Sequence, residues 1–134
     1  MANINMGKVV LGGLVAGVVL NIGEALLNTV VLAKAMEEDF RRLNLPPQPS
    51  GTFIAKAVVM TFLLGIVIVY LYAAIRPRFG AGVIAWFFAY VYVGVIQVAL
   101  GLFSVQPFMI GLVWGLVEFA AGAVAGAWFY KEEA

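Results

Sequence analysis

The 134-residue chain is 64% hydrophobic and only 11% charged, and its balance of eight basic and seven acidic residues gives a net charge of +1. Soluble domains carry about a quarter charged residues, so this composition excludes an ordinary soluble protein and gives no basic surface for nucleic acid. The chain has neither cysteine nor histidine, which removes disulfides, thiolate sites and the usual haem ligand, and we expect no metal and no cofactor.

Four continuous apolar segments predict membrane-spanning helices at residues 9–33, 53–75, 81–105 and 108–130. Each segment meets the ~20 residues that a helix needs to cross the hydrocarbon layer. Strands of a membrane barrel would alternate apolar and polar residues instead. We therefore predict an all-α membrane protein, a single domain over residues 1–134, with four transmembrane helices in an antiparallel up-down bundle with short loops.

The first segment carries a polar stripe on one face. At about 100° per residue, Gly13, Gly17, Asn21, Glu24 and Asn28 fall within about 80° of one another. The two glycines form a GxxxG pair, a spacing that lets helix backbones approach closely. We interpret the segment as a spanning helix rather than a cleaved leader, because it is too long for the apolar core of a signal peptide.

A polar segment, "KAMEEDFRRLNLPPQPSGT", separates the first two apolar segments. Its prolines end any helix, so it predicts a short interfacial helical turn followed by a stiff linker. We expect its charged side chains to be solvated rather than to form a binding site.

Two arginines, Arg76 and Arg78, lie in the link "RPRFG" after the second segment, where we expect them to contact anionic lipid headgroups. The basic residues divide four against four between the two membrane faces, so the positive-inside rule leaves the orientation open, including insertion in both directions. The two sets are Lys8, Arg76, Arg78 and Lys131 on one face and Lys34, Arg41, Arg42 and Lys56 on the other.

The third segment has a weaker polar stripe, in which Tyr90, Gly94, Gln97 and Gly101 share a face about 60° wide. Its other aromatic residues are typical of an interfacial belt, with a pigment or quinone surface as the alternative.

The fourth segment, "GLVWGLVEFAAGAVAG", repeats the design of the first. Gly111, Gly115, Glu118, Gly122 and Gly126 lie within about 80° of one another. We expect these glycines and those of the other stripes to pack helices within the bundle or between subunits.

The two intramembrane glutamates suggest a site. An ionised residue at a helix centre costs roughly 2.5 to 3.5 kcal/mol or more, and the basic residues all lie at or near helix ends. Burial and mutual repulsion therefore favour uncharged carboxylates or a bound cation. We predict a proton- or cation-linked site formed by Glu24 and Glu118 with Asn21, Asn28, Gln97 and Tyr90 around it. The alternative is that the same groups only hold helices together.

At "LYAAIRPRFG" and "LVWGLVEFAAGAVAGAWFY" the chain resembles a family of small four-helix bacterial integral membrane proteins with no assigned function. The resemblance covers most of the length and implies a bacterial inner (cytoplasmic) membrane location, but no activity. In outline the chain is also similar to the small multidrug resistance transporters, which have four helices, a glutamate in the first helix and dimeric assembly. Its local motifs and its second glutamate differ from theirs, so their drug-binding role is not carried over.

These observations lead to two hypotheses. The first is a homodimer in the lipid bilayer whose buried carboxylates bind protons or a cation, with coupling to solute transport as its extension. The second is an accessory or structural subunit of a larger membrane complex, or a lipid- or pigment-binding protein. We expect no enzymatic activity, because a nucleophile with its usual base cannot be assembled without histidine or cysteine.

Overall fold

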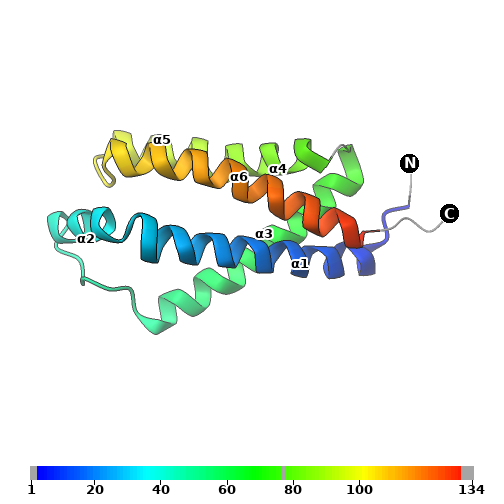
Figure 1. The fold of residues 1–134 in the computed structure, drawn as a ribbon, viewed down its shortest axis with the longest axis horizontal. Helices are drawn as coiled ribbons and strands as arrows, with labels where there is room; N and C mark the ends of the chain where they lie inside the picture. The colour runs from blue at the N-terminus through cyan, green and yellow to red at the C-terminus, as the bar shows by residue number, and fades with distance from the viewer. Residues whose placement is uncertain (1–2, 77, 131–134) are drawn as a thin grey trace.

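The computed structural model describes residues 3–76 and 78–130, and within these ranges it contains helices and no strands (Figure 1). Four spans are long and apolar enough to cross a membrane, at Met6–Val31, Gly51–Ile75, Arg78–Ala99 and Val105–Phe129. The prediction of an all-α fold of the membrane type is therefore confirmed.

The first span is a helix in two parts. Helix α1 (Met6–Leu26) begins at Asn5, whose side chain accepts a hydrogen bond from the backbone N–H of Lys8 at 3.1 Å. It continues as a π-helical segment, η1 (Leu27–Val31), and is broken at Leu32 before the short helix α2 (Ala33–Arg42). A helical turn was predicted at α2, but the structure shows a ten-residue helix.

The second span, α3 (Gly51–Ile75), begins at Ser50, whose hydroxyl accepts a hydrogen bond from the backbone N–H of Phe53 at 3.2 Å. The third span has three parts: α4 (Arg78–Trp86), the π-helical segment η2 (Phe87–Tyr92) and α5 (Val93–Ala99).

The third span ends at Ala99 and not at residue 105, because Gly101 turns the chain with a φ of +73°. Glycine tolerates this left-handed conformation, which commonly ends a helix. Gly101 therefore does not pack helices within this chain: it lies outside the helix, and a Cβ atom added there would meet nothing within 4 Å. Its packing between subunits stays a prediction.

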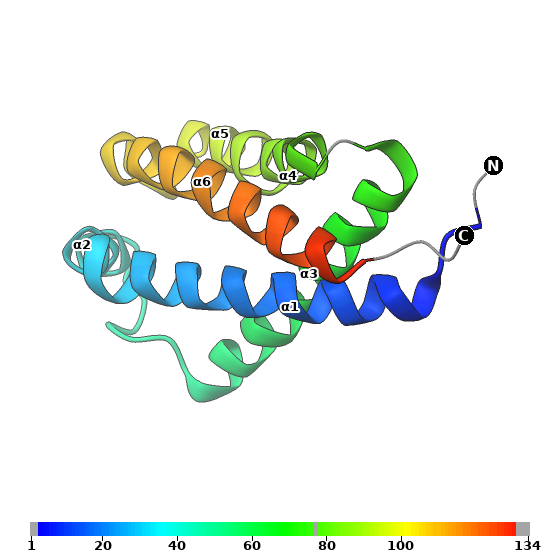
Figure 2. The same ribbon diagram turned by 45° about the vertical axis from the view of Figure 1, so that its right-hand side comes forward.

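Helix α6 (Val105–Phe129) completes an antiparallel arrangement in which consecutive spans run in opposite directions (Figure 1). Helix α1 packs on α3 and α6, and α4 packs on α6. The start of α1 and the end of α6 lie close together, and the two helices separate toward α2, as the two views show (Figure 2). The bundle is therefore tight at one end and open at the other.

Glycines explain the tight end. A Cβ atom added to Gly126 of α6 would lie 2.8 Å from the carbonyl oxygen of Gly12 and 2.5 Å from Val69 Cγ2. A Cβ atom at Gly17 would lie 2.5 Å from Phe62 Cδ1 of α3, and one at Gly13 would overlap Ile66. Small residues thus bring α1 against both α3 and α6, as close helix packing in lipid requires.

Candidate functional site

A cavity of about 370 Å³ lies where α1 and α6 separate. Every span contributes to its wall, and the wall holds two carboxylates, two amides and a phenol among apolar and aromatic side chains. The lining residues are Leu20, Glu24, Leu27, Asn28, Leu32, Met36, Thr61, Leu64, Ala89, Tyr90, Gly94, Gln97, Phe103, Pro107, Phe108, Gly111, Glu118 and Phe119.

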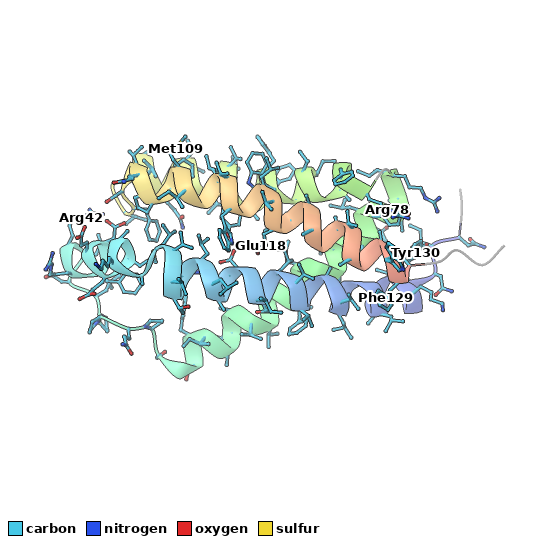
Figure 3. All side chains as sticks on the ribbon, viewed as in Figure 1. Arg42, Arg78, Met109, Glu118, Phe129 and Tyr130 are labelled. Atoms are coloured by element: carbon cyan, nitrogen blue, oxygen red, sulfur yellow. The ribbon has the colours of Figure 1, made fainter. Side chains whose placement is uncertain are left out.

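Glu118 lies near the middle of α6 and points between α6 and α1 (Figure 3). Its residue is 6% exposed. The Nε1–H group of Trp114 donates to Glu118 Oε2 at 3.1 Å and also to the backbone carbonyl of Gly23 at 3.1 Å. Among the described residues, no group donates a hydrogen bond to the other carboxylate oxygen, Oε1.

The absence of a side chain at Gly23 lets Glu118 approach α1. A Cβ atom at this position would lie 2.6 Å from both Cδ and Oε2 of Glu118. Sequence reasoning missed both Gly23 and Trp114. The spacing of Trp114 and Glu118, four residues apart on one helix, could have indicated their contact, whereas the proximity of Gly23 depends on how α1 and α6 are rotated.

Glu24 has a different environment, because both of its carboxylate oxygens accept hydrogen bonds. The hydroxyl of Tyr90 donates to Oε1, and Nδ2 of Asn28 donates to Oε2 at 3.1 Å. The same Asn28 group also contacts the backbone carbonyl of Glu24 at 2.8 Å. Glu24 is thus held by the third span and by its own helix.

Both partners of Glu24 lie in π-helical segments, Asn28 in η1 and Tyr90 in η2. A π-helical turn takes an extra residue relative to the α-helix, so it changes the direction in which the neighbouring side chains point. Single-turn π segments occur frequently at functional sites. Here, two of them border the same cavity.

The ring of Tyr90 is fixed by its neighbours. It packs edge to face on Phe119, with 5.5 Å between ring centroids, and a Cβ atom at Gly115 would lie 3.0 Å from it. The more distant Gly111 would place its Cβ 3.8 Å from the same ring. Gly115 therefore makes room for an aromatic side chain rather than for a helix backbone, whereas a Cβ at Gly111 would make only an ordinary contact with the ring.

The remaining predicted glycines lie against different neighbours. A Cβ at Gly122 would lie 3.2 Å from Leu20 Cδ2 of α1. One at Gly94 would overlap the ring of Phe108.

Five of the six predicted site residues line the cavity, namely Glu24, Asn28, Tyr90, Gln97 and Glu118. Asn21 does not: its Nδ2 donates to the carbonyl of Gly17 at 2.9 Å and to that of Val58 on α3 at 3.5 Å. The expectation that Asn21 belongs to the site is therefore wrong. A stripe about 80° wide on α1 faces two neighbouring helices, and Asn21 is on the α3 side.

Two predicted lipid contacts, Arg76 and Arg78, lie at the opposite end of the bundle from α2 and border a second hollow with Tyr72 and Phe79. The guanidinium carbon of Arg76 lies 5.7 Å from the ring centroid of Tyr72. Their contact with lipid headgroups stays a prediction.

The cavity has a clear electrostatic character. In residues 3–76 and 78–130, none of the side chains that line it is a lysine or an arginine. The described residues also contain no group of three or more acidic, histidine or cysteine side chains that could hold a metal ion. Two carboxylates thus share a largely apolar cavity, and no cationic side chain of the described residues lines it.

No protein-family model, curated protein or solved structure matches this chain. The two resemblances noted from the sequence therefore stay predictions.

Proposed function

We propose that this chain is a small integral membrane protein of the bacterial inner membrane that binds protons or a cation at Glu118 and Glu24, coupled to the movement of a solute. The observation that supports this most directly is the environment of Glu118. The Oε1 atom of Glu118 is buried and has no hydrogen-bond donor among the described residues, and Glu118 lines the cavity from which a proton or cation could reach it.

The two carboxylates have different roles in this proposal. Burial of an ionised carboxylate without a partner is unfavourable, and a proton or a cation removes the cost. Among the described residues, Glu118 accepts a hydrogen bond only from Trp114, at Oε2, whereas Tyr90 and Asn28 donate to the two oxygens of Glu24. We therefore assign proton or cation binding chiefly to Glu118, with Glu24 as the fixed negative group beside it.

The size of the cavity supports the transport element of the proposal. A water molecule occupies about 30 Å³ of liquid. The cavity of about 370 Å³ is therefore larger than a single ion or water requires, and it can hold a small solute next to the carboxylates.

The proposal is tested by comparing the natural chain with Glu118→Gln and Glu24→Gln in reconstituted vesicles. Infrared difference spectra between pH 5 and 9 report carboxyl protonation, and repeating them with added Na⁺ or K⁺ reports competition by a cation. We expect Glu118→Gln to abolish the carboxyl signal and Glu24→Gln to shift it. Glu37→Gln, which removes an exposed carboxylate on α2, is the matched control and should change nothing.

An unchanged carboxyl signal in Glu118→Gln would contradict the proposal.

A second role for the same groups, cohesion of the helices, is favoured by their hydrogen bonds, since Trp114 joins α6 to α1 and Tyr90 joins the third span to α1. It predicts that both glutamine variants lower thermal stability while neither proton nor cation binding is detected in the natural protein.

A further inference from the structure

A polar cluster centred on one buried carboxylate lies outside the spans, between α2 and the loop that precedes α6. Asp39 is 2% exposed, although we expected the charges of this segment to be solvated. Its Oδ1 accepts from the hydroxyl of Ser104 at 2.6 Å, and its Oδ2 accepts from the backbone N–H of Ser104 at 3.1 Å.

Arg42 completes the cluster. One guanidinium nitrogen, Nη2, donates to Asp39 Oδ1 at 3.1 Å and to the carbonyl of Leu102 at 3.0 Å, and Nη1 donates to the carbonyl of Gly101 at 2.7 Å. Hydrogen bonds to charged groups are about twice as strong as those between neutral groups. Asp39 also lies at the N-terminus of α6, where the helix dipole favours a negative charge.

This cluster joins two segments that both border the cavity. Leu32 and Met36 line it from the α2 side, and Phe103 and Pro107 line it from the loop and the start of α6. Asp39 lies one helical turn beyond Met36, and Ser104 directly follows Phe103. The hydrogen bonds of Asp39 and Arg42 thus hold α2 against the far wall at the open end of the bundle, where Figure 3 shows Arg42.

Irregular backbone flanks α2 on both sides. The π-helical segment η1 and Leu32, with φ −106° and ψ 8°, precede it, and Asn44, with a φ of 54°, follows it. A rigid helix between two irregular connections can rotate as a unit, since hinges are a few residues at the ends of elements that absorb the change in backbone angles.

We propose that α2 is a lid over the cavity, closed by the Asp39–Ser104 latch, which we define as Asp39, Arg42 and Ser104 with the carbonyls of Gly101 and Leu102. The lid controls access to the cavity from the aqueous side that holds α2. That the lid regulates binding at Glu118 rests on the proposed function, whereas the opening and closing of α2 does not.

The experiment measures how fast an aqueous reagent reaches the cavity. Because the chain has no cysteine, Thr61→Cys places a single thiol, similar in size to threonine, in the cavity wall. A membrane-impermeant thiol reagent is added to reconstituted protein, and its reaction rate is compared between the parent and the latch variants Asp39→Asn and Ser104→Ala. A thiol at Gln48→Cys, exposed in the loop before α3, reports access outside the cavity.

We expect each latch variant to raise the labelling rate of Thr61→Cys about tenfold and to leave that of Gln48→Cys unchanged. Glu38→Gln, an exposed acidic residue on the same helix, is the matched control and should have no effect. Equal rates in the parent and both latch variants would overturn the lid, as would an equal acceleration by Glu38→Gln. Circular dichroism identifies a variant that has lost its helices, and Ser104→Ala, which deletes a single hydroxyl, then decides the test.

The same measurement in the Glu118→Gln background separates the two proposals. If the latch variants still accelerate labelling there while the natural protein binds neither protons nor cations, the lid stands and the proposed function fails. If Glu118 titrates but labelling ignores the latch, the function stands and the lid fails.

Discussion

Glu24 and Glu118 are two identical side chains that line one cavity in different hydrogen-bonding environments. Glu24 has a donor on each oxygen, which fixes its position. Glu118 shares a single donor, Trp114, with the backbone of Gly23 and keeps one oxygen without a partner among the described residues. A carboxylate whose oxygens both accept hydrogen bonds gains little free energy when it binds a ligand. A buried oxygen without a donor gains the most, because the ligand removes the cost of its missing hydrogen bond.

Two glycines allow this difference to be tested, because an added methyl group meets different atoms at each. In Gly23→Ala the methyl group meets the carboxylate end of Glu118, which can swing into the cavity. In Gly126→Ala it meets the carbonyl of Gly12 and the side chain of Val69, and backbone cannot move away so easily.

We therefore expect Gly23→Ala to alter proton or cation binding with little loss of stability, and Gly126→Ala to lower stability by about 1 to 3 kcal/mol. Infrared titration and thermal unfolding in detergent measure the two effects, and Gly51→Ala, where a Cβ meets nothing within 4 Å, is the control. The reverse pattern would show that the contact of Gly23 with Glu118 does not position the carboxylate.

Among the elements, the two π-helical segments both border the cavity. The π-helical segments η1 and η2 direct Asn28 and Tyr90 toward Glu24, and α2 closes on the loop before α6 through Asp39. The tight end, by contrast, is regular helix packed on glycine. The side-chain hydrogen bonds to Glu24 therefore come from segments that depart from ideal α-helical geometry.

The latch has a defined pH dependence. Burial alone raises the pKa of the Asp39 carboxyl, but the hydrogen bonds from Ser104 and Arg42 outweigh it and hold this pKa below its ordinary value of 3.8. A carboxyl whose pKa is lower in the closed state stabilises that state fully above 3.8, and the contribution disappears as the pH falls through the lowered pKa. The other charged side chains of α2, at Lys34, Glu37, Glu38 and Arg41, are exposed.

We therefore expect α2 to stay closed at neutral and mildly acidic pH and to open only below 3.8. A spin label at Lys34→Cys on α2 measures this through its mobility between pH 7 and 3. Asp39→Asn should make the label mobile at every pH. A transition near pH 6 in the natural latch would mean that a group other than Asp39 controls the lid.

At the scale of the whole molecule, the apolar surface is large because lipid, not water, surrounds the spans. One side of the molecule is less well covered by neighbouring helices than the others. The first ten residues of α3, 51–60, are all exposed, and α3 diverges there from its neighbours (Figure 2). The open end of a single chain therefore leaves helix surface available to a second copy.

We expect native mass spectrometry of gently solubilised protein to find a homodimer. The pairing buries a helix face that a single four-helix chain leaves to lipid, and closed two-fold dimers are the commonest oligomers. The same spectra of Glu118→Gln should show the same dimer. Unrelated chains retained in stoichiometric amounts would instead make the protein a subunit of a larger complex.

Composition and local pattern were enough to predict the fold class, the four spans and most of the polar residues that line the cavity. Hydrophobicity over about 20 residues and a period of 3.6 residues are local properties. They therefore place Glu24, Asn28, Tyr90, Gln97 and Glu118 on the polar stripes of their own helices without knowledge of neighbours. Five of the six predicted site residues do line one cavity.

Which groups meet could be seen only once the helices were packed together. The contact of Asn21 with α3, the approach of Gly23 to Glu118, and the burial of Asp39 against Ser104 all depend on the rotation and separation of helices that are distant in sequence. The end of the third span is a further example. The apolar run continues past Ala99, so hydrophobicity does not mark the end of the helix, which the turn at Gly101 sets. Local periodicity assigns a residue to a face, but which helix lies opposite that face is settled by packing of the whole bundle.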